Sequence, residues 1–483
     1  MAIEKGIKHM TNIIKNPIRP GFFPDPSILR VGNDYYMVNS SFLYFPCIPI
    51  SHSTDLVNWE VVGHAITNPE YIDFSGYEQG RGLWAPDISY SNGKYYIVAT
   101  LRGNDDAEIT HQQMVVYSDK PEGPYSKPVY IKEKGIDPSL FHDDDGRHYM
   151  LFNTSVKIIE LTEDCLAAKS PVRILHEGWS KVKTEGPHIL KKNGYYYLIM
   201  AEGGTGDGHM ITVARSRSLD EPFENCPYNP LLTQTDPSAY LQRTGHGKFF
   251  VGPDDEWYVV HLCSRKNGGK YSLLGRETAI QKVTWTDDEW PIINDGNGPL
   301  NEIEASYEIP DKENSLYSID FAKAYPSDVI YYGPYLFTRQ TAIDCDVSLS
   351  FTNLATTENE WGLIFYYDTY SYFKFGIKRD AQRYRLFISM MNITIDEKEI
   401  LLHESDLDSF NSAIGLLIET RELTKEFYLL NNGQKTLVHT IDDCSLVTDE
   451  GISYGKRFTG PVVGVFGYKN NPAFAEFTMD NKD

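Results

Sequence analysis

Five ionisable residues, four acids and one histidine, open five similar stretches of the chain. These stretches are DPSILRVGNDYYMV (Asp25), APDISYSNGKYYIVAT (Asp87), DPSLFHDDDGRHYMLF (Asp137), EGPHILKKNGYYYLIM (Glu185) and GHGKFFVGPDDEWYVVHL (His246). Each of the five lies beside Pro or Gly at the start of a short apolar run. Carboxyl and imidazole groups are the side chains that most often donate and accept protons in catalysis. If the fold brings these residues together, they can carry general acid–base chemistry.

Carboxyl groups in such a cluster suit one reaction in particular. Two carboxyl groups that flank a glycosidic bond are the minimal machinery for its hydrolysis, provided that one is ionised while the other is protonated. Burial or a neighbouring like charge raises the pKa of a carboxyl group, and a nearby cation favours its ionised form. Asp25, Asp137 and Glu185 supply three carboxyl groups, so that the third can tune the acid. Arg276, in LLGRETAIQKVTW, is the candidate cation.

The spacing of these residues predicts the elements that position them. The gaps between the five lead residues are 62, 50, 48 and 61 positions. Each repeat has an apolar strand, a turn of Gly, Asn and Asp, and a second strand that begins with aromatic residues, a pattern typical of hairpins. Near-regular repeats of this kind predict a β-propeller, here with five blades. The first strand of a blade lines the central channel, so the five lead residues are expected to converge on one mouth. The alternative is that the acids only cap turns.

The repeat stops near residue 300. The segment PIINDGNGPLNEIEASYEIPDKENS has no periodicity and is expected to be a connector. From residue 317 about eight alternating strands follow, which predicts an antiparallel β-sandwich. We therefore expect an all-β chain with a five-bladed propeller over residues 10–300 and a β-sandwich over residues 317–483.

Composition narrows the choice of partners and compartment. The formal net charge of −22 argues against nucleic acid and anionic membranes and is compatible with a neutral substrate. The six cysteines form no CxxC pattern, and we expect reduced, buried thiols. The N-terminal MAIEKGIKHMTNIIKNP lacks the apolar core of a signal peptide, and no 18-residue apolar run occurs. These features predict a cytoplasmic protein.

The motifs around these residues also resemble those of a known family. FPDPS, WAPD, IDPS, TEGP, TGHG and GRET, at Asp25, Asp87, Asp137, Glu185, His246 and Arg276, occur in the order found in glycoside hydrolase family 43. The resemblance covers nearly the whole chain and is to the two-domain β-xylosidases of this family, of the β-xylosidase/α-L-arabinofuranosidase type. It implies a five-bladed propeller followed by a β-sandwich of the concanavalin A-like or jelly-roll kind.

The resemblance also implies roles for the three carboxyl groups. Asp25 is then the general base that activates water, and Glu185 is the general acid that protonates the leaving oxygen. Asp137 tunes and positions the acid. The implied reaction is an inverting single displacement, which places the two working carboxyl groups roughly 6.5–9.5 Å apart. Asp87 is expected to form structural hydrogen bonds near the pocket.

Five further residues match positions around the family's sugar. Arg276 resembles an arginine that contacts the sugar and the neighbouring carboxylates, with a salt bridge at the rim as the alternative. Trp84 and Phe42 match aromatic residues that pack against the ring, although such strand ends also form core. Thr205, in EGGTGDGH, matches a residue at the sugar site or belongs to a plain loop. His246 resembles a histidine beneath the pocket that contacts a water-bound calcium ion in some members; structural support is its alternative, and one histidine makes no calcium site because calcium prefers oxygen ligands.

These matches predict a function and leave alternatives open. We expect an inverting exo-glycosidase that releases xylose from the non-reducing end of small β-1,4-xylo-oligosaccharides. An α-L-arabinofuranosidase, or an enzyme with both activities, is the nearest alternative because the two sugars present similar hydroxyl groups. A retaining fructosidase would carry NDPNG where this chain has PDPS. A non-catalytic sugar-binding propeller would have no use for three carboxylates that repel one another.

The remaining expectations concern cofactors, assembly and the second domain. The resemblance implies no required cofactor, with calcium as an optional ion, and suggests homo-oligomers of two or four subunits. The sandwich is either a carbohydrate-binding module or a partner that closes the pocket, and the resemblance favours the partner. The run WGLIFYYDTYSYFKF is a candidate source of aromatic tips for that contact.

Overall fold

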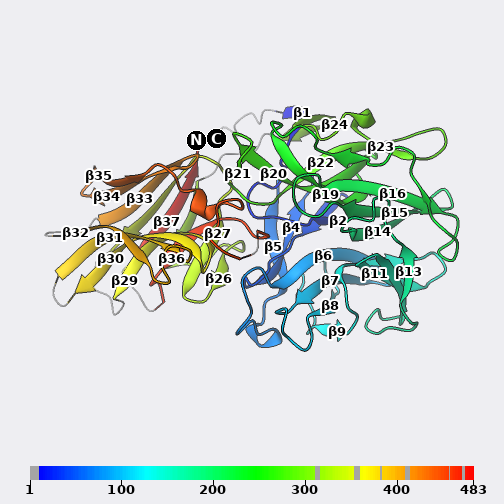
Figure 1. Cartoon of the computed structure of the whole chain (residues 1–483), viewed down its shortest axis with the longest axis horizontal. Helices are drawn as coiled ribbons and strands as arrows, with labels where there is room; N and C mark the ends of the chain where they lie inside the picture. Colours follow the sequence, from blue (N-terminus) through cyan, green and yellow to red (C-terminus); the bar gives the residue numbers. More distant parts are fainter. Residues whose placement is uncertain are drawn as a thin grey trace, which may run out of the picture.

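The chain forms two β-rich bodies that lie side by side, the propeller in blue to green and the sandwich in yellow to red in Figure 1. The computed structural model describes residues 10–310, 316–352, 359–380, 383–407, 414–455, 457–469 and 474–482. The helices of the described part are short 3₁₀ turns at Pro69–Tyr71 (η1), Asn294–Gly296 (η2) and Ser445–Val447 (η3). No helix within these residues is long and apolar enough to cross a membrane. The predicted all-β class, a five-bladed propeller followed by a sandwich, is confirmed.

Each blade is an antiparallel sheet whose strands follow in sequence order. Blade I consists of β2 (Ser27–Val31), β3 (Asp34–Val38), β4 (Cys47–Ser53) and β5 (Glu60–Ile66), and blade II of β6 (Gly82–Ser91), β7 (Lys94–Arg102), β8 (His111–Ser118) and β9 (Val129–Ile131). Blade III consists of β10 (Ile136–His142), β11 (His148–Asn153), β12 (Val156–Leu161) and β13 (Arg173–His176). Blade IV contains β14 (Glu185–Lys192), β15 (Tyr195–Glu202), β16 (Met210–Ser216), β17 (Glu224–Asn225) and β18 (Leu232–Thr233). Blade V contains β19 (Leu241–Val251), β20 (Trp257–Asn267), β21 (Tyr271–Ser272), β22 (Glu277–Trp285) and β23 (Pro291–Ile293).

The core of the propeller lies between its blades. Five separate apolar clusters each join two neighbouring blades, from the pair I–II round to the pair V–I. The cluster between blades II and III, for example, packs Tyr96 and Val98 against Met150 and Phe152. Alternating strand residues on both faces of each sheet supply these contacts. The innermost strands β2, β6, β10, β14 and β19 are thereby held around a common channel.

The segment predicted as a connector contains an additional strand. β24 (Glu302–Pro310) pairs with β1 (Met10–Lys15) in an antiparallel ladder beside blade V. The Asn16 side chain donates to the carbonyl groups of Ile280 and Leu300 at 2.8 and 2.9 Å. The expectation of a connector was wrong for residues 302–310, because their alternation of buried and exposed side chains is masked in the sequence by glutamates on the exposed face.

The second body is a sandwich of a six-stranded and a seven-stranded antiparallel sheet. The first sheet contains, in spatial order, β25 (Tyr317–Asp320), β37 (Phe474–Asn481), β28 (Cys345–Phe351), β33 (Ile414–Arg421), β34 (Thr424–Asn431) and β35 (Gln434–Ile441). The second contains β26 (Ile330–Tyr332), β27 (Tyr335–Arg339), β36 (Val462–Phe466), β29 (Glu360–Asp368), β30 (Ser371–Asp380), β31 (Arg383–Asn392) and β32 (Ile400–Asp406). The eight predicted strands are present, and the sequence missed five others that are short or polar: β25, β26, β27, β32 and β35.

The two bodies share an apolar interface. Phe22, Phe42 and Tyr44 of the propeller belong to one buried cluster with residues of the seven-stranded sheet, among them Phe337 and Tyr366. The rings of Tyr44 and Phe337 meet edge to face, with their centroids 6.3 Å apart. Side chains that are buried in this way contribute roughly 1.5–3 kcal/mol each. The interface is therefore built like a domain core, which favours a fixed arrangement of the two bodies.

Removal of residues 317–483 is predicted to uncover this cluster and to make the propeller aggregate. The measurement is the yield of soluble protein, together with the thermal unfolding midpoint of any soluble fraction. Co-expression of residues 317–483 as a separate chain is the control, because the sandwich can then bury the interface cluster again. A soluble truncated propeller that unfolds at the temperature of the full chain would contradict the prediction.

Candidate active site

At the channel mouth every blade has a residue in the left-handed region, either within its innermost strand or, for Asp25, two residues before it. Their φ angles are 53° at Asp25, 41° at Ala85, 56° at Asp137, 54° at Gly186 and 51° at His246. The strand register shifts beside this residue in blades II to V. Such a bulge re-aims the neighbouring side chain and costs of order 1 kcal/mol or more at a non-glycine residue. The repeated kink turns the ends of the strands, and with them the acids, into the channel.

The mouth contains a pocket of about 140 Å³. All eight residues predicted around the site lie on its wall: Asp25, Phe42, Trp84, Asp137, Glu185, Thr205, His246 and Arg276. Ala85, Ile136 and Phe458 complete the lining. The structure therefore brings together four of the five lead residues, as the repeat predicted.

Asp87 is the exception, and here the prediction of a common mouth was wrong. Blade II places Ala85, not Asp87, at the kink, so that Asp87 lies two residues deeper in the channel and does not line the pocket. Its carboxylate is 1 % exposed and accepts hydrogen bonds from Ser27 Oγ at 2.7 Å and from the Leu140 N–H at 3.0 Å. These contacts join blades I, II and III.

Asp25 is held in the ionised form. Its Oδ1 accepts from Arg276 Nη1 at 2.9 Å, and its Oδ2 accepts from Ser40 Oγ at 2.6 Å. Burial alone raises the pKa of Asp25, but the charge of Arg276 and the Ser40 hydrogen bond outweigh it and hold the pKa below the ordinary value. Ser40 is itself fixed, because its Oγ accepts from the Ala85 N–H at 2.7 Å. Asp25 is thus a buried base with one orientation.

Asp137 and Glu185 form the acidic half of the pocket. Burial first, and then the carboxylates of Glu185 and Asp25, raise the pKa of Asp137 well above its ordinary value. Asp137 Oδ2 accepts the Gly186 N–H at 3.1 Å, and this contact lowers the pKa of Asp137 without outweighing burial and the neighbouring carboxylates. Asp137 therefore keeps its proton to a higher pH than an ordinary aspartate does.

His209 contacts Glu185, and the sequence analysis missed it. Its Nδ1 lies 3.3 Å from the carbonyl oxygen of Arg243, which can only accept, so Nδ1 carries a proton. Its Nε2 lies 3.3 Å from Glu185 Oε1 and has no other partner within the described residues. His209 is thus placed to orient the carboxyl group of Glu185. No sequence pattern marked His209, because it precedes β16 on the second hairpin of blade IV.

Arg276 connects the base to the second domain. Its Nε and Nη2 donate to the carbonyl oxygen of Phe458 at 2.9 and 2.6 Å, and its Nη1 also donates to Thr205 Oγ1 at 3.1 Å. Phe458 belongs to the sandwich, just before β36. The same guanidinium therefore contacts the carboxylate of the propeller, a loop of blade IV and a carbonyl group of the sandwich.

Aromatic rings form one wall of the pocket. The Trp84 ring lies edge to face with Phe458 at 5.5 Å and tilted against Phe42 at 6.2 Å between centroids. Phe42 is 2 % exposed and also belongs to the interface cluster, so it is both core and pocket wall. Phe458 was not predicted: the aromatic run at residues 361–375 forms β29 and β30, from which Tyr366 and Tyr372 join the interface cluster but do not line the pocket.

Comparison with known proteins decides the family. The model described as glycosyl hydrolases family 43 matches residues 14–291, and that of the β-xylosidase C-terminal concanavalin A-like domain matches residues 332–479. The chain belongs to glycosyl hydrolase family 43. Membership supports an enzyme over a non-catalytic sugar-binding propeller.

Three relatives illustrate the similarity. A xylan 1,3-β-xylosidase of Vibrio sp is 42 % identical over a region that covers 61 % of this chain and 60 % of that protein, less than two thirds of its length. A xylosidase/arabinosidase 43B of Humicola insolens is 34 % identical and covers 97 % of this chain and 96 % of that protein. The crystal structure of a xylan β-1,4-xylosidase from Bacillus halodurans C-125 has a TM-score of 0.87 at 32 % identity and covers 97 % of this chain and 100 % of that one.

In this family 43 enzyme the channel beneath the pocket contains the ammonium group of Lys248. Lys248 Nζ lies 2.5 Å from Asp87 Oδ1 and 3.0 Å from Ser27 Oγ, and His188 Nδ1 is 3.7 Å from the same carboxylate. The charge of Lys248 outweighs burial and holds the pKa of Asp87 below its ordinary value, while burial lowers the pKa of His188 to about 3. Lys248 is thus a positive charge where the inner strands meet.

This arrangement does not fit a calcium ion beneath His246. Calcium takes six to eight oxygen ligands. Asp87 is already neutralised by Lys248, and the ammonium group would repel a second cation placed beside it. The two carboxylates nearest His246, Asp25 and Asp137, lie 3.8 and 3.9 Å from its Nδ1 and are engaged in the pocket above. Burial lowers the pKa of His246, which favours a neutral structural ring.

Replacement of Arg276 by Met is predicted to move the acidic limb of the pH profile of kcat/KM to higher pH. Without the guanidinium, burial dominates at Asp25, so a higher pH is needed to ionise the base. We also expect kcat/KM at the optimum to fall about 10²-fold, the usual effect of losing one charge-stabilising group. Arg276→Lys keeps the charge and is the control. An acidic limb that stays in place in Arg276→Met would contradict the assignment.

Replacement of His209 by Leu is predicted to impair substrates whose leaving group is a sugar more than 4-nitrophenyl glycosides. The change removes the ring that contacts Glu185, the expected acid, and a good leaving group needs little protonation. We expect kcat to fall roughly 10-fold for the sugar leaving group, with little change for the aryl glycoside. Glu185→Ala serves as the reference, since it should show the same selectivity in a stronger form, whereas an equal fall for both substrates in His209→Leu would exclude this role.

Proposed function

We propose that this protein is an inverting exo-β-xylosidase that cleaves xylose from the non-reducing end of small β-1,4-xylo-oligosaccharides. The observation that carries the proposal is the pocket of about 140 Å³ that contains Glu185 together with Asp25, whose pKa is lowered, and Asp137, whose pKa is raised. Its walls come from the inner strands of the propeller and from Phe458 of the sandwich. A pocket closed in this way takes the end of a chain, where an open groove would take its middle.

In the proposed reaction Asp25 accepts a proton from a water molecule as that water attacks the anomeric carbon. Glu185 gives its proton to the departing glycosidic oxygen in the same step. Asp25 is ionised beside Arg276, and Glu185 has Asp137 and His209 as its neighbours. A single displacement needs one carboxylate as base and one carboxyl group as acid, and Asp25 and Glu185 take these two roles in the proposal.

The aromatic wall provides the apolar contact for a sugar ring. Trp84, Phe42 and Phe458 present ring carbons, while Arg276 and Thr205 present polar groups at the same pocket. Pockets that bind small molecules combine a mainly apolar lining with a few placed polar groups. Asp137 acts in this scheme on the acid and not on the substrate, because its carboxylate accepts from the Gly186 backbone.

A second activity, hydrolysis of α-L-arabinofuranosides, is the nearest candidate. The Humicola relative, named a xylosidase/arabinosidase, matches this chain over nearly its full length, which favours a pocket that accepts both sugars. The Vibrio relative, named a 1,3-β-xylosidase, makes the β-1,3 linkage a further substrate to compare. The match to family 43 gives no support to the fructosidase alternative.

Three finer expectations belong to the same proposal. The enzyme acts in the cytoplasm on short oligosaccharides. It forms a homo-oligomer, as the resemblance to the family suggests. It needs no added calcium, which is supported by the position of Lys248 in the channel.

The decisive experiment compares β-1,4-xylobiose, β-1,3-xylobiose and 4-nitrophenyl α-L-arabinofuranoside, each with and without EDTA. We expect the β-1,4-linked substrate to be cleaved fastest, α-xylose to appear first by NMR, and EDTA to change nothing. Asp25→Ala is the matched inactive control, because no other group in the pocket is placed to activate water. β-Xylose as the first product would contradict inversion, and turnover of the arabinoside alone would move the enzyme to the second candidate. Loss of activity in EDTA would refute the calcium proposal alone.

A further inference from the structure

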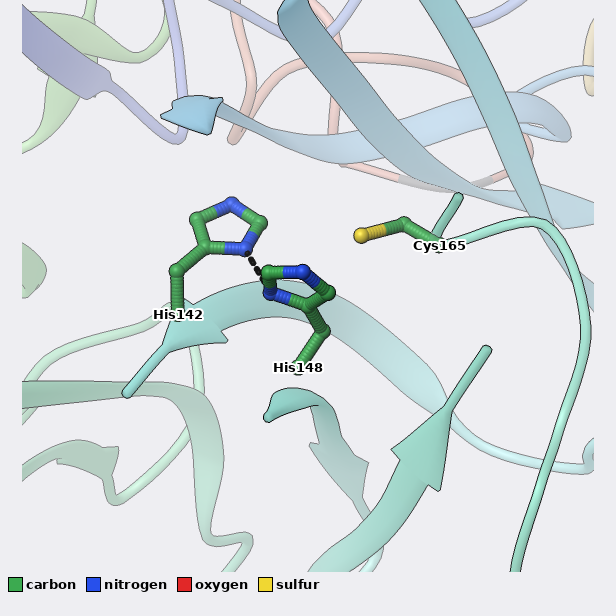
Figure 2. Close-up of side chains that lie close together, drawn as sticks. All are labelled: His142, His148 and Cys165. Carbon is green, nitrogen blue, oxygen red and sulfur yellow. Dashed lines mark hydrogen bonds between the residues drawn. The ribbon is translucent and has the colours of Figure 1, made fainter. Parts of the chain in front are cut away.

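A cluster of three metal-binding side chains lies far from the pocket, between blades II and III. Figure 2 shows His142, His148 and Cys165 directed toward one point. One ligand atom from each, two imidazole nitrogens and the thiol sulfur, lies within 4.8 Å of the others. His148 and Cys165 are buried and His142 is half-buried, so the cluster is partly exposed at His142.

The local fold sets these residues beside one another. His142 ends β10 and His148 begins β11, and the two are direct partners across the ladder, with ring centroids 4.8 Å apart. Cys165 follows β12 in a tight turn, where its N–H donates to the Thr162 carbonyl group at 2.8 Å and its φ is 61°. The turn directs the sulfur toward the two rings. β10 carries Asp137 near its other end, so the cluster and the pocket lie at opposite ends of one strand.

The hydrogen bonds of the cluster show where a cation would be bound. The two Nδ1 atoms are 2.9 Å apart and share one proton. The outer nitrogens have polar partners in blade II: His142 Nε2 lies 3.0 Å from Ser89 Oγ, and His148 Nε2 lies 3.4 Å from the Asn92 side-chain amide. Partners of this kind orient metal-binding histidines, because they hold the ring and fix its tautomer. A cation can take the place of the shared proton while these outer contacts keep the rings aligned.

The thiol of Cys165, the third side chain of the cluster, selects the kind of cation. Burial raises the pKa of the Cys165 thiol to about 12. The Tyr96 hydroxyl contacts the sulfur and favours its thiolate form. Two imidazoles and one thiolate suit zinc and similar thiophilic ions, and not calcium or magnesium, which prefer oxygen. Tetrahedral zinc with Zn–N of about 2.0 Å and Zn–S of about 2.3 Å sets its ligand atoms roughly 3.3–3.6 Å apart, a separation that small side-chain rotations reach.

We propose that His142, His148 and Cys165 bind one zinc-like, thiophilic divalent cation, with solvent at the fourth position. Binding breaks the S–H bond of Cys165 and forms a metal–sulfur bond, so one proton leaves for each ion bound. His148 transfers its ring proton from Nδ1 to Nε2, where the Asn92 amide turns its oxygen to accept it. The ion links β10, β11 and the turn after β12, and through Ser89 and Asn92 it fastens blade III to blade II.

The test is titration of the reduced, metal-free enzyme with Cd²⁺, followed by the thiolate-to-metal charge-transfer band in the ultraviolet. The expected result is a band that saturates at one equivalent in the wild type and is absent in Cys165→Ser. Cys226→Ser is the matched control, since Cys226 is equally buried but packs among apolar residues of blades IV and V, and it should keep the band. No band in the wild type, or a band that survives in Cys165→Ser, would show that the cluster is only a hydrogen-bonded pair of histidines beside a buried thiol.

Two further measurements keep the test independent of folding and of hydrolysis. His142→Gln changes the half-buried ligand without opening the core, and it should weaken zinc binding by more than about 10-fold. Calorimetry in two buffers of different ionisation enthalpy should report one proton released per zinc in the wild type. Turnover of an aryl glycoside should remain at the wild-type level in His142→Gln, so loss of metal binding there cannot be mistaken for failure of the active site. Zinc affinity that is unchanged in His142→Gln would overturn the proposal.

Discussion

The buried ion pair between Asp25 and Arg276 is the constraint on which the rest of the structure depends. Asp25 lies in blade I and Arg276 just before β22 in blade V, so the pair spans the joint at which the propeller closes. Both side chains are largely withdrawn from water, and removing one partner of such a pair typically costs about 3–5 kcal/mol. The same guanidinium donates to the Phe458 carbonyl group of the sandwich. One cation thus keeps the base ionised, joins the first blade to the last and anchors the second domain.

The electrostatics of the mouth follow from how its charges are divided. Arg276 and Ser40 stabilise the negative form of Asp25 on one side. On the other side burial and the carboxylates of Glu185 and Asp25 raise the pKa of Asp137. His209 contacts the expected acid, with its Nε2 3.3 Å from Glu185 Oε1. Deeper in the channel Lys248 neutralises Asp87, which keeps a fourth carboxylate from raising the negative charge of the mouth further.

Much of this arrangement could be predicted because the propeller is a repeat. Asp25, Asp137, Glu185 and His246 head equivalent strands, and a repeated strand order brings equivalent positions to one axis. Asp87 shows the limit of that reasoning: the kink of blade II falls at Ala85, and a shift of two residues along a strand moves a side chain from the pocket to the channel below it. The strand at residues 302–310 was missed for a related reason, since its pairing with β1 joins segments almost 300 residues apart and leaves little local signal.

The sequence by itself determined the fold class, the number of blades and the identity of the carboxyl groups, since all of these depend on local patterns of apolar residues, turns and spacing. Only the tertiary structure decided how the acids are charged and what surrounds them. Arg276, His209 and Phe458 reach the pocket from blade V, blade IV and the sandwich, and the cluster of His142, His148 and Cys165 forms where a hairpin meets a turn. Proton affinity and metal affinity depend on burial and on neighbours a few ångströms away. Those neighbours are distant in the chain, so folding alone brings them together.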